Sequence, residues 1–164
     1  MTTNAVKQKQ LILIVDDDAS IRITASGILE LMGYSILNAD SGAACLETCS
    51  RQIPDLILLD AVMPGIDGFA CALQLKKLLG LQCPPIFMMT ALDDLESIYR
   101  SIDIGINDYL VKPLIWSDLA AKIEQAAINR SKTEELKRQF EEIYSLKEKL
   151  NDSINQVKNR RRYA

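Results

Sequence analysis

The sequence predicts an α/β protein in which a doubly wound, five-stranded parallel sheet is flanked by helices and the last helix extends into a coiled coil. Five short apolar runs alternate with segments of helical spacing, and the connections between them are short. The runs do not alternate between apolar and polar residues, which is typical of strands covered on both faces. Strand and helix in strict alternation imply right-handed crossovers and parallel strands.

In the first half of the chain, apolar runs predict the strands and turn-forming residues mark the limits of the helices. Nothing alternates in Leu11–Val15, so this run predicts a strand buried on both faces. The helical spacing after this strand ends at Gly33. Ser41 opens the next helix, and Pro54 precedes the third apolar run. The expected elements are a strand over 11–15, a helix over 21–32, a strand over 34–39, a helix over 41–51 and a strand over 56–59 that ends at Asp60.

The second half repeats the pattern with prolines as the main boundaries. Met63, Pro64 and Gly65 form a turn, and Pro84 and Pro85 introduce the fourth apolar run. The expected elements are a helix over 68–79, a strand over 86–89 that ends at Thr90, a helix over 93–104, a strand over 108–111 closed by Lys112 and Pro113, and a helix from 117 almost to the end.

The chain contains no histidine, which excludes a Ser-His or Cys-His catalytic pair and a phosphohistidine relay within it. A structural zinc site would need thiolates alone, and the cysteines lack the usual CxxC spacing. We therefore expect ordinary buried or half-buried thiols, with redox or metal roles as the alternative. The four cysteines are Cys45, Cys49, Cys71 and Cys83.

Charge divides the chain into unlike parts. Residues 1–128 hold 9 Lys and Arg against 16 Asp and Glu, a net −7, whereas residues 129–164 hold 10 against 6, a net +4. We expect a disordered segment over 1–10, one domain over 11–128 and a helical coiled-coil extension with a basic end over 129–164. No apolar run approaches the ~18–20 residues that span a bilayer, and the start lacks an apolar signal core. A cytoplasmic protein without a membrane partner is expected.

Polar side chains follow four of the predicted strands. Asp16 and Asp17 end the first strand, Asp60 the third, Thr90 the fourth and Lys112 the fifth. Ligands of doubly wound sheets bind outside the carboxyl ends of the strands. Carboxylates that converge at one edge repel each other unless a cation holds them, and Mg²⁺ prefers such oxygen ligands.

The same residues suggest phosphate chemistry. Lys112 and Thr90 suit phosphate oxygens, and a carboxylate such as Asp60 beside a metal-bound phosphoryl donor can attack phosphorus and become an acyl phosphate. Any one of them alone is usually a cap or a solvated loop residue, and Asp18 is interpreted as the cap of the first helix. Their coincidence on four strand ends favours a functional site.

The motifs ILIVDDDASIR, DLILLDAVMPGIDGF, MMTA and DYLVKP, spread over residues 11 to about 125, resemble the receiver domain of two-component response regulators. The resemblance implies the flavodoxin-like strand order 2-1-3-4-5. It implies Mg²⁺ bound by Asp16, Asp17, Asp60 and the backbone carbonyl of Val62. It also implies that Asp60 accepts a phosphoryl group from a histidine kinase or phosphotransfer protein.

The resemblance further implies a switch and a cis peptide bond before Pro113. Thr90 and Tyr109 would be the switch pair and Lys112 the phosphate-contacting lysine. Phosphorylation would draw Thr90 inward, and Tyr109 would then turn from an exposed to a buried rotamer. This movement would repack the surface formed by the fourth helix, fifth strand and fifth helix.

The tail carries a heptad pattern of about three repeats, with one lysine at a core position. So long a helix cannot be buried in its own domain, which favours a parallel homodimer over a helix folded back on the domain or a frayed linker. The predicted dimer positions are Leu136, Phe140, Ile143, Lys147, Leu150, Ile154 and Val157.

Several alternatives stay open. The chain is not expected to be an enzyme; a haloacid-dehalogenase-like phosphatase would need a second aspartate where Val62 stands. It could instead be a dimerisation scaffold that takes no phosphate, or the regulatory part of a larger signalling enzyme such as a cyclic-dinucleotide cyclase or hybrid kinase. The basic residues in 158–162 invite a nucleic-acid interpretation, but no helix-turn-helix or aromatic platform accompanies them, so nucleic acid is not expected as a partner.

Overall fold

The computed structural model describes residues 9–91 and 104–162, with side chains up to residue 156. Its centre is a five-stranded, all-parallel sheet in the order β2-β1-β3-β4-β5, which confirms the predicted sheet and strand order. The strands are β1 (Leu11–Val15), β2 (Ser35–Ala39), β3 (Leu56–Asp60), β4 (Ile86–Thr90) and β5 (Asp108–Val111).

Side chains cap the first three helices, two of them at residues that the sequence indicated. Asp18 accepts a hydrogen bond from the backbone of Ser20, which confirms Asp18 as a cap and starts the first helix two residues before the expected position. Ser41 and Asp67 cap the next two helices in the same way. The helices are α1 (Ala19–Leu31), α2 (Gly42–Arg51), α3 (Gly68–Leu79), the 3₁₀ helix η1 (Gly80–Gln82) and α5 (Trp116–Arg162). The helix expected over 93–104 lies outside the described residues except for Ile104.

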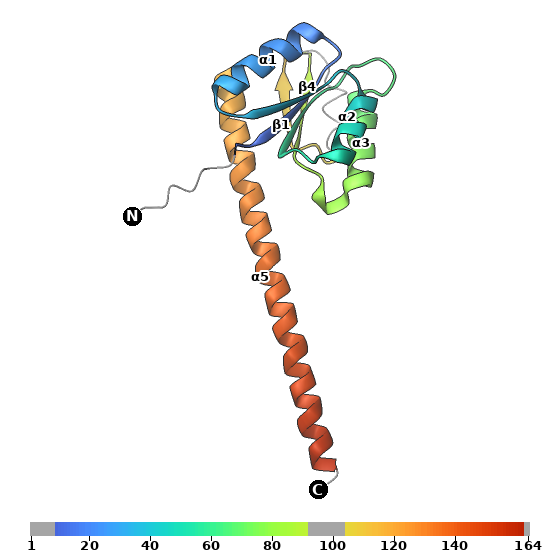
Figure 1. Cartoon of the computed structure of the whole chain (residues 1–164), viewed down its shortest axis with the longest axis vertical. Helices are drawn as coiled ribbons and strands as arrows, with labels where there is room; N and C mark the ends of the chain where they lie inside the picture. Colours follow the sequence, from blue (N-terminus) through green and yellow to red (C-terminus); the bar gives the residue numbers. More distant parts are fainter. Residues whose placement is uncertain (1–8, 92–103, 163–164) are drawn as a thin grey trace, which may run out of the picture. The chain divides into compact units, whose positions relative to one another are not determined.

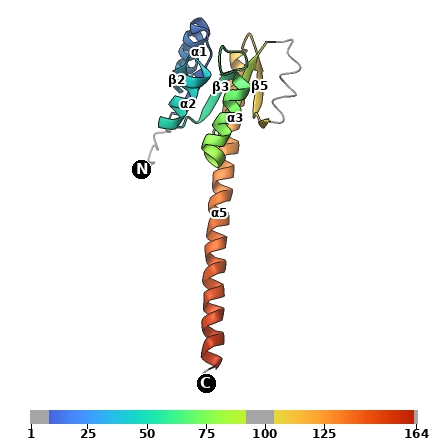
Figure 2. The ribbon, with the colours of Figure 1, turned by 90° about the vertical axis from the view of Figure 1, so that its right-hand side faces the viewer.

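Helices cover both faces of the sheet. Figure 1 shows α1 and the first turns of α5 on one face, and Figure 2 shows α2 and α3 side by side on the other. The second face holds a continuous core in which strand residues such as Leu13, Ile57 and Met88 join Phe69 and Leu75 of α3. Strands buried on both faces need the unbroken apolar runs seen in the sequence, and β3 and β4 are buried at every position.

The cysteines belong to this core. Cys45, Cys49 and Cys71 are buried and Cys83 is half-buried, and all four are free thiols. Hydrogen bonds with the thiols of Cys49 and Cys71, and then burial, raise the pKa of Cys45, so this group stays protonated. The expectation of ordinary buried or half-buried thiols is confirmed.

The parallel register brings the carboxyl ends of four strands to one edge of the sheet. Val15 pairs with Leu59 across β1 and β3, and Thr90 pairs with Val111 across β4 and β5. Residues that directly follow β1 and β5 therefore lie beside the last residues of β3 and β4. This arrangement places the polar residues singled out in the sequence along a single edge.

Two glycines allow close packing next to this edge. A Cβ built on Gly68, the first residue of α3, would lie 2.1 Å from the carbonyl oxygen of Asp60. A Cβ on Gly42, the first residue of α2, would lie 2.8 Å from the carbonyl oxygen of Ile66. Both contacts are too short for a real side chain, so the loop between β3 and α3 needs glycine at both helix starts.

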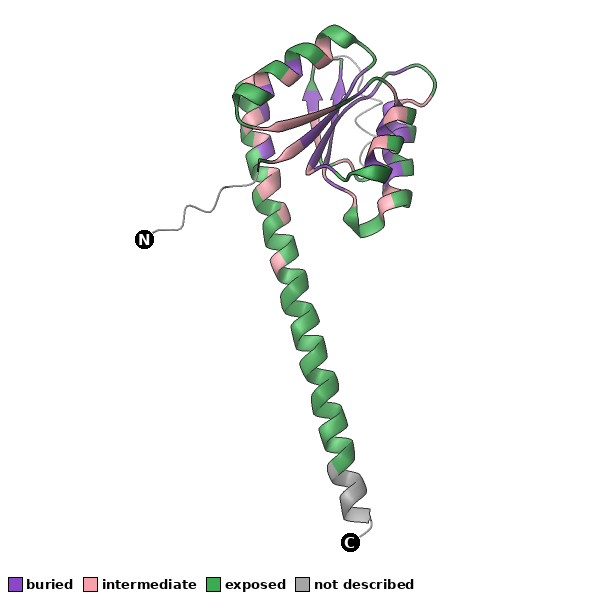
Figure 3. Ribbon diagram, in the orientation of Figure 1, coloured by how far each residue is buried: buried purple, intermediate pink, exposed green. Residues whose placement is uncertain are grey.

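The chain forms two compact units, Met1–Ile123 and Glu124–Ala164, and α5 runs across the division between them. The predicted boundary after residue 128 falls within this continuous helix, and the domain limits stay a prediction. In the second unit most side chains of α5 are exposed (Figure 3). Within 9–91 and 104–162, no helix has both the length and the apolar character that a membrane crossing requires.

Candidate functional site

Three aspartates form an acidic cluster at the carboxyl edge of the sheet. One carboxylate oxygen from each of Asp16, Asp17 and Asp60 lies within 4.8 Å of the other two. Asp16 is fully buried and Asp60 is 6% exposed, whereas Asp17 is exposed. The cluster thus has a buried base and one side open to solvent.

A lysine from the far end of the sequence neutralises part of this cluster. Nζ of Lys112 lies 2.8 Å from Oδ2 of Asp16 and 3.1 Å from Oδ1 of Asp60. Burial of the ammonium group works against its charge, but the hydrogen bond and attraction from Asp16 and Asp60 outweigh burial and raise the pKa of Lys112. The ammonium group therefore stays charged and bridges two carboxylates.

The surroundings of Asp60 favour its neutral form, whereas those of Lys112 favour its charged form. Burial, and then repulsion from Asp16, raise the pKa of Asp60 above its usual range despite the nearby Lys112. Its Oδ1 also accepts a long hydrogen bond from the backbone N–H of Val62 at 3.4 Å. The ionised form of Asp60 is therefore only partly compensated by the protein itself, which is the condition under which an added cation is favoured.

The buried carboxylate of Asp16 is held from several sides. Oδ1 accepts a hydrogen bond from the backbone N–H of Asp18 at 2.9 Å, and Oδ2 accepts the bond from Lys112. The backbone N–H of Asp16 donates to the carbonyl of Ala39 on β2 at 3.2 Å. These contacts fix Asp16 as the rigid member of the cluster.

Arg22 is a neighbour of the site that the sequence interpretation overlooked. Its Nη1 donates to the carbonyl oxygens of Asp16 at 2.7 Å and Asp17 at 3.1 Å. The signal available in the sequence was a lone arginine in the first turn of the helix that starts directly after the acidic residues. Gly68, which backs onto the Asp60 carbonyl, was likewise assigned only as a helix start.

The remaining predicted residues surround the cluster. Thr90 is buried at the end of β4, and its hydroxyl donates to the carbonyl of Ala91 at 3.4 Å. Its backbone carbonyl accepts from the N–H of Lys112 at 2.8 Å, so the two residues are directly linked. The Lys112–Pro113 peptide bond is cis. Val62 is 72% exposed.

Tyr109 already lies inward in this structure. Its ring packs against the core cluster and its hydroxyl oxygen is buried. The fourth helix of the predicted switch surface falls largely outside the described residues, and the switch roles of Thr90 and Tyr109 stay predictions.

The donor set of the cluster suits a hard divalent cation. All three side chains offer carboxylate oxygens, the ligands that Mg²⁺ prefers, and the exposed Asp17 leaves room for water or phosphate oxygens on one side. The charge of Lys112 offsets only part of the negative charge of three carboxylates. The acidic cluster is thus able to hold Mg²⁺.

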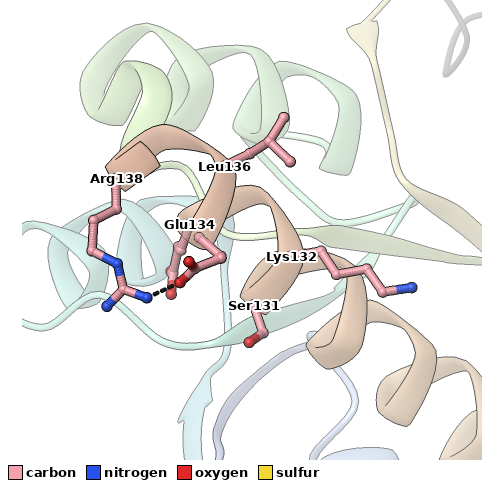
Figure 4. Close-up of a pocket in the computed structure, with 6 residues that line it drawn as sticks. Ser131, Lys132, Glu134, Leu136 and Arg138 are labelled. Carbon is pink, nitrogen blue, oxygen red and sulfur yellow. Dashed lines mark ion pairs between the residues drawn. The ribbon is translucent and has the colours of Figure 1, made fainter. Parts of the chain in front are cut away.

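The predicted dimer positions belong to the second unit and are exposed wherever they are described. Leu136, Phe140 and Ile143 are 65%, 73% and 64% exposed, and Leu150 and Ile154 follow at heptad spacing. The hollow drawn in Figure 4 is lined by residues of α5 alone, among them Leu136 and Arg138, and Arg138 forms an ion pair with Glu135. It is a stretch of helix surface, which is consistent with an uncovered seam.

A family model and curated relatives both match the same part of the chain. The model of the response regulator receiver domain family matches residues 12–124. The chain is 37% identical over 116 residues to a protein named probable transcriptional regulator ycf27 from Porphyridium aerugineum, a match covering 71% of this chain and 47% of the relative. It is 36% identical over 124 residues to the response regulator MprA of Mycobacterium leprae, covering 76% and 53%. The chain spans about half the length of these curated relatives.

Solved structures agree with the fold. A CheY-like receiver domain protein from Methanospirillum hungatei superimposes with a TM-score of 0.71 at 29% identity, covering 76% of this chain and 98% of that one. The chemotaxis protein CheY4 of Vibrio cholerae gives a TM-score of 0.67 at 27% identity, covering 72% and 98%.

Proposed function

The chain belongs to the response regulator receiver family, and on this premise we propose that Asp60 accepts a phosphoryl group from a partner histidine kinase or phosphotransfer protein. The observation that carries the proposal is the acidic cluster of Asp16, Asp17 and Asp60 bridged by Lys112. Phosphoryl transfer depends on positioning and on compensation of charge, and this cluster offers both.

In the proposed reaction, a carboxylate oxygen of Asp60 attacks phosphorus. A P–O bond forms to Asp60 as the bond from phosphorus to the donor nitrogen breaks, and the imidazole nitrogen keeps the electron pair. Asp16 and Asp17, with Asp60 and the backbone carbonyl of Val62, would hold Mg²⁺, which when bound compensates the charge of the phosphoryl oxygens. Lys112 would contact one of those oxygens and Thr90 another.

Phosphoryl transfer would change the surface with which this chain binds a partner. A phosphoryl group adds about −1.5 to −2 charge and new acceptor oxygens at Asp60. The hydroxyl of Thr90 and the ammonium group of Lys112 stand next to it as donors. Because Lys112 also bonds to the Thr90 carbonyl, a movement at one of them reaches the start of the loop after β5. The chain would thus act by binding and switching, without turnover of a substrate of its own.

The exposed heptad positions of α5 support a homodimer as the form in which the switch acts. Two copies would bury Leu136, Phe140, Ile143 and Leu150 against each other, with Lys147 at a core position limiting the register. The parallel coiled coil would join two receivers and pass a rearrangement from one to the other.

A second candidate is a regulatory part of a larger signalling protein. It is favoured by the relatives, about twice as long as the matched segment and named as transcriptional or response regulators. For such a protein the output, a nucleic-acid partner included, would lie outside the receiver. The scaffold that takes no phosphate is disfavoured by the complete set of Asp16, Asp17, Asp60 and Lys112.

The test is incubation with Mg²⁺ and acetyl phosphate, followed by intact mass and by molar mass from light scattering, with Asp60→Asn as the matched control. Gain of one phosphoryl group in the wild type and none in the variant supports the proposal. A change of molar mass on phosphorylation would make dimerisation the output, whereas a constant dimer would assign signalling to rearrangement within it. No phosphoryl gain with Mg²⁺ binding verified would favour the scaffold.

A further inference from the structure

The guanidinium group of Arg22 is bonded to the backbone that carries the acidic pair. Nη1 donates to the carbonyl oxygen of Asp16 at 2.7 Å and to that of Asp17 at 3.1 Å. Arg22 lies in the first turns of α1, and its own backbone N–H donates to the carbonyl of Asp18 at 3.2 Å. The side chain therefore folds back over the residues that join β1 to α1.

This pair of bonds restrains the backbone from which the Asp17 side chain projects. The carbonyl of Asp16 belongs to the peptide plane before Asp17, and the carbonyl of Asp17 belongs to the plane after it. One nitrogen bonded to both oxygens restricts the two soft dihedral angles of Asp17. The β1 pairings end at Val15, and beyond them Arg22 adds to two other bonds, from the Asp16 N–H to the Ala39 carbonyl and from the Asp18 N–H to Oδ1 of Asp16.

The restraint matters because Asp17 is the exposed member of the cluster. Asp16 is held by Lys112 and by the backbone of Asp18, and Asp60 is buried at the end of β3. An exposed aspartate without such anchors loses conformational freedom when it binds a cation. If its backbone is already held in place, this entropic cost is smaller and the cation binds more tightly.

We propose that Arg22 is a positioning residue of the Mg²⁺ site, which orients Asp17 through its backbone without contacting the ion. The inference rests on the metal site of the proposed function. Outer-shell partners of this kind typically change metal affinity by about 10–100-fold when removed.

The positive charge of Arg22 and its backbone bonds affect Mg²⁺ affinity in opposite directions. The direction in which affinity changes when Arg22 is replaced therefore shows which effect dominates. A cation next to the acidic cluster repels Mg²⁺, and its removal would tighten binding if charge alone mattered. Loss of the backbone restraint would weaken binding. Arg22→Lys separates the two further, because it keeps the positive charge while changing the geometry of the donor.

The experiment measures the Mg²⁺ dissociation constant of the full chain by calorimetry for wild type, Arg22→Met, Arg22→Gln and Arg22→Lys, with the melting temperature taken without Mg²⁺. Arg51→Met is the matched control, since Arg51 on α2 makes only an exposed ion pair with Glu47 among the described interactions. We expect a dissociation constant raised by about 10-fold or more in Arg22→Met, a smaller rise in Arg22→Gln and Arg22→Lys, and none in Arg51→Met.

Unchanged or tighter Mg²⁺ binding by Arg22→Met would overturn the inference. If Arg22→Met does not fold, the comparison of Arg22→Lys with wild type decides, because the charge is unchanged, and equal or tighter binding by Arg22→Lys overturns it. Acetyl phosphate labelling of the wild type tests the phosphorylation of Asp60 separately from the role of Arg22 in Mg²⁺ binding. A wild type that binds Mg²⁺ with the expected dependence on Arg22 but takes no phosphoryl group contradicts the proposed function alone.

Discussion

Nζ of Lys112 lies 2.8 Å from Oδ2 of Asp16, although 96 residues separate them in the sequence. The contact joins the loop after β5 to the end of β1, and Lys112 reaches Asp60 of β3 from the same position. One ammonium group thus offsets two carboxylates where the strand ends meet. Lys112 and Mg²⁺ should therefore compete for the same negative charge.

Lys112→Met is expected to bind Mg²⁺ several-fold more tightly than wild type, because a cation beside the site is lost. The same change should slow labelling by acetyl phosphate about 10-fold or more at saturating Mg²⁺, because a phosphoryl oxygen loses its charged donor. Calorimetry and intact mass measure the two effects. Lys122→Met, which removes the half-exposed ion pair with Asp108, is the control and should change neither; weaker Mg²⁺ binding by Lys112→Met would contradict the competition.

Asp60→Asn is expected to stabilise the metal-free protein. The raised pKa of Asp60 means that the folded chain binds a proton there more readily than the unfolded chain. Stability is therefore lost as the pH rises past the usual aspartate range, and a neutral side chain avoids this loss at pH 7. The melting temperature of metal-free Asp60→Asn should therefore lie above that of the metal-free wild type.

Asp17→Asn is the control for the melting temperature of Asp60→Asn. Its carboxylate is exposed, so the metal-free melting temperature should stay close to that of wild type while stabilisation by added Mg²⁺ is reduced. If Asp17→Asn raises the metal-free melting temperature as much as Asp60→Asn does, overall charge and not burial of Asp60 is responsible.

Mg²⁺ binding should weaken on acidification at a higher pH than ordinary carboxylates would require. Burial and repulsion from Asp16 raise the pKa of Asp60, so a proton competes with the cation for Asp60 at a higher pH than it would for an ordinary aspartate. Calorimetry at a series of decreasing pH values should show falling affinity for Mg²⁺ and proton release on binding. Asp60→Asn should flatten the dependence; an equally steep one in this variant would assign the proton to another group.

Gly68→Ala should impair phosphorylation through the position of Asp60. A Cβ at residue 68 would lie 2.1 Å from the Asp60 carbonyl oxygen and 2.8 Å from the α-carbon of Ala61, so the end of β3 or the start of α3 must shift. Because displacements of about 1 Å can cost about 100-fold in rate, slower acetyl phosphate labelling and a lower melting temperature are expected.

Gly27→Ala is the matched control, since a Cβ there meets nothing within 4 Å. Alanine in a helix interior is favoured over glycine by about 0.5–1 kcal/mol, so this variant should be slightly stabilised and label normally. Wild-type labelling in Gly68→Ala would show that the loop after β3 accommodates the methyl group without moving Asp60.

Substitutions in the predicted seam should change the molar mass in opposite directions. Ile143→Glu places a charge in the stripe of Leu136, Phe140 and Leu150 and should give a monomer, while Lys147→Leu should strengthen association. Light scattering over a concentration series measures both. Ser145→Glu adds the same charge at a neighbouring position outside the seam, and dissociation by this variant would argue against the heptad register.

The strands and helices could be assigned from the sequence because their causes are local. Unbroken apolar runs mark β3 and β4, and capping side chains such as Asp18 and Ser41 mark helix starts within one or two residues of their observed positions. The strand-end aspartates could be found for the same reason, since each stands directly after an apolar run.

Other features depend on how distant segments meet, and no local pattern shows them. The bond from Arg22 to the Asp16 and Asp17 carbonyls depends on the angle at which α1 leaves β1, and the inward ring of Tyr109 depends on the core beside β5. The need for glycine at position 68 arises only where α3 meets the Asp60 carbonyl. Sequence alone therefore determined the described strands and helices and the chemical character of the site. The tertiary structure decided which charges compensate which, because sheet order brings residues far apart in the chain to within hydrogen-bonding distance.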